Sequence, residues 1–309
     1  MNLKPHQTLS VCHPTPEQLA HAHLKVRELY WAINSPALLK SSANLPMTDP
    51  SFWKEQTKLA LPLISDLLND PSPIIKQLDT KRKTKIGLVF EDLLLFWFQN
   101  HPTWQLIAHD EQIFFKKETL GALDFVIQTE TKILHLEVAV KFYLCQNNSS
   151  AWEHWVGPSL KDNLYKKMQR LKTHQIPIAK RAETIKHFSF RKMPVPTDSL
   201  AVVKGVFFNR WAGPLVAPHF GKLPTGTWLF ADELDSYLLD KENQMWVERH
   251  RPDWLAPSLS TTLPRGYSHT QMHSIRVLKP RMFSTVLHEN DLWMETERIV
   301  VVPNHWSAS

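Results

Sequence analysis

The stretch TLGALDFVIQTETKILHLEVAVKFYL, residues 119–144, decides the fold of this chain. Apolar and polar residues alternate in two runs, 123–128 and 133–144, and residues 129–132 between them are polar. Alternation with a period of two is typical of β-strands, because successive side chains point to opposite faces of a sheet. The stretch therefore predicts two paired strands joined by a short loop.

The length of this loop determines which residues face each other. A regular hairpin with a four-residue loop pairs Gln128 with Ile133, and counting back places Asp124 opposite Glu137. Their β-carbons would then lie about 4.5–5.5 Å apart. Two facing carboxylates repel each other, and a divalent cation between them removes the repulsion, since Mg²⁺ typically binds one or two carboxylates. The hairpin predicts a metal site made by Asp124 and Glu137.

Lys141 lies on the same predicted strand face, four residues beyond Glu137. Its flexible side chain could bring the ammonium group back toward the metal, where it would stabilise negative charge or orient a water molecule. The alternative interpretation is a solvated strand face on which acids and a lysine alternate by chance.

A buried helix is predicted before the hairpin. Residues 86–99 are apolar nearly all round, and the helix should end before Pro102. Glu91 projects from an apolar face of this helix, and burying a lone carboxylate is costly unless it is paired, neutralised or bound to metal. Glu91 is therefore a third candidate metal ligand. Asp92 competes with it by the same logic, and a solvent-exposed helix end is the alternative for both.

A basic helix is predicted from about Ser159 to His174, before Pro177. Its cations form a candidate phosphate-binding strip that would position a nucleic-acid backbone without reading its sequence. A charged, solvated helix face is the alternative. The strip consists of Lys161, Lys166, Lys167, Arg170 and Lys172.

The order of these motifs resembles the PD-(D/E)XK nuclease superfamily. The resemblance rests on the helix with Glu91 and on the segments LGALDF (120–125) and HLEVAVKFYL (135–144). More closely, the chain is similar to an uncharacterised bacterial family called domain of unknown function 1853. The segment WVGP (155–158), the following helix and, more weakly, WLAP (254–257) extend this similarity.

The resemblance implies that Asp124 and Glu137 ligate Mg²⁺, with Mn²⁺ as a substitute. It also implies that Lys141 assists the attacking water and that Glu91 supports the metal or the water. The chain departs from the superfamily pattern at two positions. Leu123 replaces the proline before the aspartate, and Ala139 stands where the lysine is usual. Lys141 is displaced by two residues, about 6.6 Å along a strand.

The expected architecture is α/β: a restriction-endonuclease-like mixed sheet flanked by helices. We expect an N-terminal helical segment at 1–80, because apolar residues recur there at helical spacing. A nuclease-like core should span 81–212, with further strands near 112–115 and 202–208. A β-rich C-terminal part, 213–309, should pack on this core and include a strand at 298–302.

Composition limits the other possibilities. The chain has 309 residues and a formal charge of +6, which permits an anionic partner. Eight glycines and no G-x-G-x-x-G run argue against a glycine-rich phosphate loop. Cys12 and Cys145 cannot form a zinc site alone, which fits a reducing cytoplasm, and no segment is apolar enough to suggest membrane attachment. His269 and His273 have the spacing of a zinc-binding helix but lack its glutamate.

These observations favour metal-dependent phosphodiester hydrolysis of DNA or RNA. A nucleic-acid-binding module with this fold and little or no catalysis is one alternative, favoured by the displaced lysine. An interaction or scaffold protein is the other, favoured if the tryptophan-rich C-terminal part exposes an apolar surface.

Overall fold

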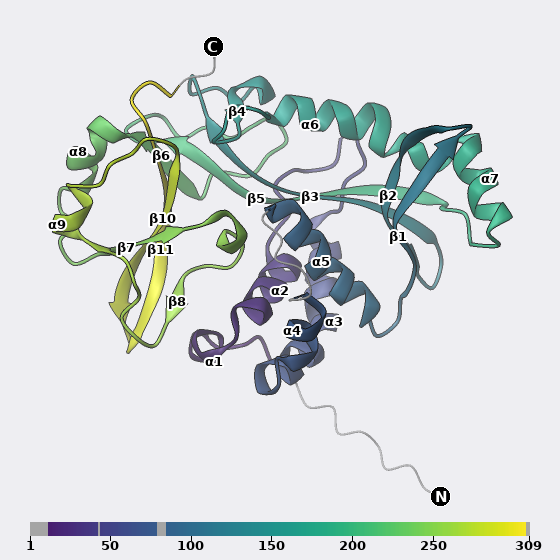
Figure 1. Cartoon of the computed structure of the whole chain (residues 1–309), viewed down its shortest axis with the longest axis horizontal. Helices are drawn as coiled ribbons and strands as arrows, with labels where there is room; N and C mark the ends of the chain where they lie inside the picture. Colours follow the sequence, from purple (N-terminus) through teal and green to yellow (C-terminus); the bar gives the residue numbers. More distant parts are fainter. Residues whose placement is uncertain (1–11, 43, 79–84, 307–309) are drawn as a thin grey trace, which may run out of the picture.

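One large mixed sheet with helices on both faces forms the centre of the molecule (Figure 1). The computed structural model describes residues 12–42, 44–78 and 85–306, so the predicted boundary at residue 80 lies outside the described residues. The main strand order is β1-β2-β3-β5-β6-β11-β10-β7-β9, with β4 pairing with β3 and β8 pairing with β11. The α/β class and the mixed sheet are as predicted.

The strands of the first half are longer than the sequence pattern indicated, because several continue past the alternating segment. They are β1 (Gln105–Phe115), β2 (Glu118–Gln128), β3 (Ile133–Cys145), β4 (Trp155–Val156) and β5 (Asp198–Arg210). Those of the second half are β6 (Gly226–Phe230), β7 (Met245–Arg249), β8 (Leu259–Ser260), β9 (Tyr267–Ser268), β10 (Arg281–Glu289) and β11 (Leu292–Val302).

The helices of the N-terminal part cover one face of the sheet. They are α1 (Pro16–His21), α2 (Leu24–Asn34), α3 (Pro50–Asn69), α4 (Ser72–Leu78) and α5 (Ile86–Gln99). Helix α3 begins where the Asp49 side chain accepts a hydrogen bond from the Phe52 amide, with Pro50 in the first turn. Helix α5 has the predicted bounds. Side chains of α2, α3 and α5 share one core with the even-numbered residues of β3.

The opposite face is covered by residues 38–42 and 44–47 and by α6 (Leu164–Arg170), which packs against Tyr143 and Cys145 of β3. Figure 1 shows α6 on one side of the β3–β5 pair and α2 to α5 on the other. The helix begins at Leu164 and not near Ser159, because a turn in which the Gly157 amide donates to the Asp162 carbonyl precedes it. Helix α7 (Ala182–Phe190) follows and packs near β1.

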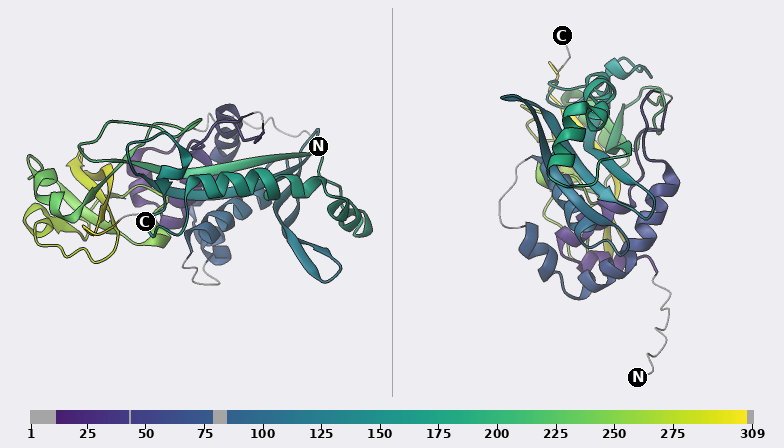
Figure 2. Two further views of the ribbon diagram at one scale, coloured as in Figure 1. Left: turned by 90° about the horizontal axis from the view of Figure 1, so that it is seen from above. Right: turned by 90° about the vertical axis from the view of Figure 1, so that its right-hand side faces the viewer.

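The C-terminal strands extend the same sheet. Strand β6 pairs in parallel with the end of β5, and its other edge pairs in parallel with β11. These strands surround a separate core that includes Trp246 and Phe283, together with side chains of α8 (Leu234–Leu238) and α9 (His269–Met272). Figure 2 shows the C-terminal part at one end of the elongated molecule and the β1–β2 hairpin at the other. Within the ranges that the structure describes, no helix combines the length and apolarity needed to cross a membrane.

Candidate functional site

Strands β2 and β3 separate where the two predicted metal ligands lie. The pairing runs from Gln128–Ile133 to Phe125–Leu136, which confirms the predicted hairpin register. Beyond this point β2 continues along β1, whereas β3 continues along β5. The next position of the register sets Asp124 opposite Glu137, so both carboxylates lie at the opening of a fork between the strands.

The Asp124 carboxylate holds the fork in a defined shape. Its Oδ2 accepts a hydrogen bond of 2.9 Å from the backbone amide of Val138. This bond provides a partner for an amide of β3 beyond the point where the pairing with β2 ends. The Asp124 side chain is therefore fixed to the strand that carries Glu137.

Glu137 is only 1% exposed to solvent. Its Oε1 accepts a hydrogen bond from the Gln175 side chain, and its Oε2 has no hydrogen-bond partner within the described ranges. Burial and the charge of Asp124 raise the pKa of Glu137 to about 9. Burial also raises the pKa of Asp124 to about 6, with a smaller contribution from Glu91. A buried acid beside a half-buried one retains a proton unless a cation compensates the pair.

Lys167 is the cation next to this pair. Its Nζ lies 3.9 Å from Oε1 of Glu137 and donates to Oε1 of Gln175 at 3.0 Å. The side chain is 12% exposed, and burial lowers its pKa although both carboxylates act in the opposite direction. A π-helical turn at 171–175 follows α6 and changes the helical phase. As a result, the Gln175 side chain contacts both Lys167 and Glu137. Sequence reasoning placed Lys167 in the strip and did not consider Gln175.

The predicted basic strip divides into two sets. Lys167 and Arg170 lie three residues apart on one face of α6. Both line a surface pocket, here called the hollow, that the carboxylate pair also lines. The other members do not line that hollow and are exposed: Lys161, Lys166 and Lys172.

Lys141 lines the hollow but is bound elsewhere. Its Nζ lies 2.5 Å from Oδ2 of Asp162, and the same oxygen accepts a 2.9 Å hydrogen bond from the Tyr143 hydroxyl. The ammonium group is therefore directed toward Asp162 and not toward the carboxylate pair, where we had expected it.

Glu91 also faces the hollow, from the first turns of α5. Its Oε1 lies 2.9 Å from Nε2 of His109 on β1, so the carboxylate has a protein partner. Asp92 does not line the hollow. In residues 12–42, 44–78 and 85–306, no three His, Cys, Asp or Glu side chains come together as a possible metal site. The structure thus brings together two carboxylates and places Glu91 beside them.

His135 supports the pair from the same face of β3. It is fully buried, its Nδ1 lies 3.2 Å from the Ser199 hydroxyl, and its Nε2 lies 3.8 Å from Oε2 of Glu137. Burial lowers the pKa of His135 to about 4, which keeps the ring neutral. The period of two in β3 was the signal that could have identified it, because residues 135 and 137 share a face.

The hollow has a volume of about 540 Å³. Its sides are the first turns of α5, the exposed edge of β3, residues 157–162 and α6. Two residues of the C-terminal part, Arg251 and Trp254, complete it. The sequence did not indicate this contribution, because nothing in it places residues 251–254 beside β3.

The other candidate histidines have protein partners. Nε2 of His269 lies 3.0 Å from the Leu238 carbonyl oxygen, and Nδ1 of His273 lies 2.6 Å from the Asp235 carboxylate. These contacts account for both rings as structural residues, His269 at the start of α9 and His273 just after its end.

A family model described as a domain of unknown function (DUF1853) matches residues 27–302. The chain belongs to this family. The DUF1853 match begins within α2 and covers α3 to α5, the fork and the C-terminal strands, whereas α1 lies outside it. No curated protein and no solved structure was found to match the chain.

Proposed function

We propose that this DUF1853 chain is a metal-dependent nuclease of restriction-endonuclease-like architecture that hydrolyses phosphodiester bonds in DNA or RNA. The observation that carries the proposal is the carboxylate pair at the fork. Asp124 and Glu137 lie together in a hollow, and one buried oxygen of Glu137 lacks a hydrogen-bond partner within the described residues. A pair of this kind is costly without a cation and well suited to one.

The donor set fits Mg²⁺ or Mn²⁺, because both are hard cations that bind carboxylate oxygens. When bound, the ion would activate a water molecule and stabilise charge on the phosphate. The Val138 amide fixes Asp124, and Gln175 fixes Glu137. These bonds fix the orientation of the two carboxylates and so reduce the side-chain movement that metal binding requires.

Lys167 takes the role that the sequence suggested for Lys141. Its ammonium group lies beside Glu137, where it can stabilise negative charge that develops on a phosphate. Arg170 lines the hollow one helical turn further and can bind a phosphate oxygen. Glu91, paired with His109, supports the site from α5. We place this activity in the cytoplasm, where a buried thiol such as that of Cys145 stays reduced.

The proposal is tested by incubating the purified chain with labelled DNA and RNA in Mg²⁺, in Mn²⁺ and in EDTA. We expect cleavage that requires a metal and is lost in Asp124→Asn, which keeps the side-chain volume. Asp66→Asn, a matched change at an exposed position of α3, should cleave like wild type. Cleavage that persists in EDTA or in Asp124→Asn would reject the proposed site.

A nucleic-acid-binding chain without catalysis is the second candidate. Two observations favour it: Lys141 is held by Asp162, and Glu91 does not join the carboxylates in a three-membered group within the described ranges. This candidate predicts salt-dependent binding without cleavage in either metal.

A further inference from the structure

The segment 250–258, here called the wall loop, connects β7 to β8 and forms one side of the hollow. Arg251 and Trp254 are its residues in the hollow. The Trp254 ring packs edge-on against Phe142 of β3, with ring centroids 5.1 Å apart. Arg251 is exposed and has no acidic partner in the part of the chain that the structure describes.

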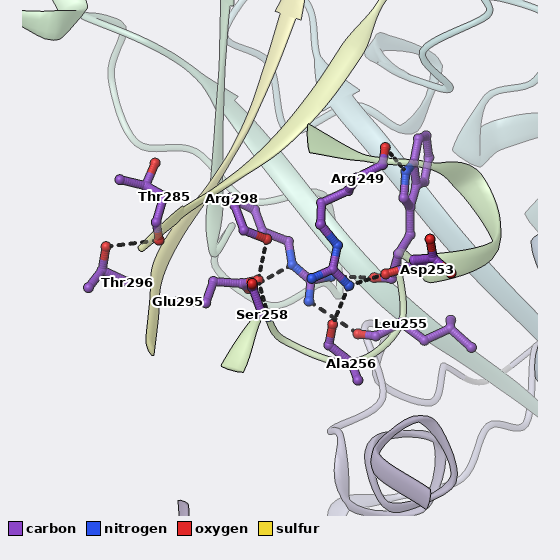
Figure 3. A network of polar contacts seen from close by, with 11 residues as sticks. Arg249, Asp253, Leu255, Ala256, Ser258, Thr285, Glu295, Thr296 and Arg298 are labelled. Carbon is purple, nitrogen blue, oxygen red and sulfur yellow. Dashed lines mark hydrogen bonds and ion pairs between the residues drawn. The ribbon is translucent and has the colours of Figure 1, made fainter. Parts of the chain in front are cut away.

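Two buried arginines fix the backbone of the wall loop (Figure 3). Arg249 is 9% exposed and donates to the carbonyl oxygens of Asp253 and Ala256. Arg298, 5% exposed, donates to those of Trp254 and Leu255. Four consecutive carbonyl groups of a short loop are therefore held by guanidinium groups from β7 and β11.

Further bonds hold this network in place. The two oxygens of Glu295 accept from Arg298 Nε at 2.7 Å and from the Ser258 amide at 2.8 Å. At the end of the loop, Arg27 of α2 donates to the Leu259 carbonyl at 2.7 Å. These bonds offset part of the cost of burying the guanidinium groups, since an unpaired buried charge is costly, although Nε of Arg249 and Nε of Arg27 have no hydrogen-bond partner among the described residues. The loop is thus preorganised, and Arg251 is presented from a fixed backbone.

A second hollow of about 350 Å³ adjoins the first, and Arg251 and Trp254 line both, together with Pro158 and Ser159. The cation Lys279 lines the second hollow and is exposed. Glu248, its only acidic lining residue in the described ranges, is paired with Arg281. Within the described ranges, a positive side chain without an acidic partner therefore lies in the second hollow. Another, Arg251, lies where the two hollows meet, with its guanidinium group 5.9 Å from the centroid of the Trp254 ring.

We propose that the two hollows form one groove that binds a single strand of nucleic acid, with Arg251 and Lys279 contacting its phosphates beyond the cleavage site. This proposal rests on the proposed function and specifies its substrate as a polymer that extends past the carboxylate pair. A single strand can bend its backbone down to the recessed Glu137. A duplex is stiff over about 150 base pairs and resists such bending.

The test measures binding of a fluorescein-labelled oligonucleotide by anisotropy at several salt concentrations, with all variants built on Asp124→Asn so that no probe is cleaved. Probes are single-stranded DNA and RNA of about 12 nucleotides, within the range that single-strand sites cover, and a duplex of the same sequence. Arg251→Ala and Lys279→Ala are compared with Arg265→Ala and Lys58→Ala, which change exposed cations that line neither hollow. Thermal melting checks that each variant is folded.

We expect each groove variant to weaken single-strand binding about tenfold and to reduce the slope of log K against log salt by about 0.7, the value for one lost phosphate contact on a single strand. The control variants should bind like the parent. Equal binding by groove and control variants, tighter binding of the duplex, or no binding by the parent would overturn the proposal. Cleavage by the chain with Mg²⁺ is measured separately. If the groove variants bind single strands more weakly but the chain cleaves nothing, only the proposed function is rejected. If the chain cleaves but the groove variants bind like the controls, only this inference is rejected.

Discussion

The ammonium nitrogen of Lys167 lies 3.9 Å from Oε1 of the buried carboxylate of Glu137, although the two residues come from different elements and lie 30 positions apart. Gln175 bonds to both side chains and fixes their separation. Lys141, on the same strand face as Glu137, is held by Asp162. The cation that serves the carboxylate pair therefore comes from helix α6 and not from strand β3.

Replacing each lysine in turn should show which of the two, Lys167 or Lys141, acts in cleavage. Lys167→Met keeps most of the side-chain volume and removes the charge, and we expect cleavage to fall about 100- to 1,000-fold, the usual cost of losing one preorganised charge-stabilising group. Lys141→Met should reduce cleavage much less. Single-turnover rates in Mg²⁺ provide the measurement. A larger loss of cleavage in Lys141→Met than in Lys167→Met would assign the catalytic role to Lys141 of β3.

The sequence could predict the hairpin because alternation and loop length together determine its register. Asp124 and Glu137 face each other for this local reason, and the bounds of α5 follow from its apolar run. The position of Lys167 could not be predicted, because it depends on which face of α6 rests on the sheet and on the π-helical turn after it. Likewise, the wall loop reaches the hollow only through contacts between distant strands.

The carboxylate pair should reduce the stability of the metal-free chain. Asp124→Asn retains an oxygen that can accept from the Val138 amide and removes a buried charge beside Glu137. We expect the free energy of unfolding in EDTA at pH 8 to rise by about 1 kcal/mol, because the Asp124 charge is one cause of the raised pKa of Glu137 and its removal makes the folded state less costly at this pH. Urea unfolding measures this change. Destabilisation of Asp124→Asn relative to Asp66→Asn would show that the pair is not strained without metal.

His101 should make the fold sensitive to acid. Its Nδ1 accepts from the amides of Thr103 and Trp104, its Nε2 lies 3.1 Å from Oε1 of Gln56, and burial lowers its pKa to about 4. The unfolded chain takes up this proton near the ordinary pKa of about 6.5. Between these values the unfolded state binds more protons, so stability falls as the pH decreases from about 6.5 to 4.

The loss attributable to His101 is at most about 3 kcal/mol, from the size of its pKa shift. His101→Asn offers an oxygen in place of Nδ1 and does not titrate, so the stability difference between wild type and this variant should shrink by that amount between pH 7 and pH 4. Urea unfolding at both pH values measures it. A difference that stays constant with pH would contradict the assignment of a neutral ring.

Lys204 should be essential to the fold and not to the site. It is fully buried in β5, its Nζ donates to the carbonyls of Ala32 and Ile33 at 2.6 and 2.8 Å, and it lies 3.4 Å from the Trp53 ring centroid. Lys204→Met should cost about 2–4 kcal/mol, because two carbonyls at the end of α2 lose their donor. The exposed change Lys58→Met should stay within about 0.5 kcal/mol. Urea midpoints compare the two, and equal stabilities would contradict this role.

Binding of Mn²⁺ tests the central claim, that Asp124 and Glu137 hold a divalent cation, most directly. Electron paramagnetic resonance of free Mn²⁺, titrated into the purified chain, counts bound ions without requiring a substrate. We predict saturable binding in wild type and in Lys141→Met, and its loss in both Asp124→Asn and Glu137→Gln, with Asp66→Asn unchanged. Binding that is absent from the folded wild type, or that is equally strong in Asp124→Asn, would contradict the account.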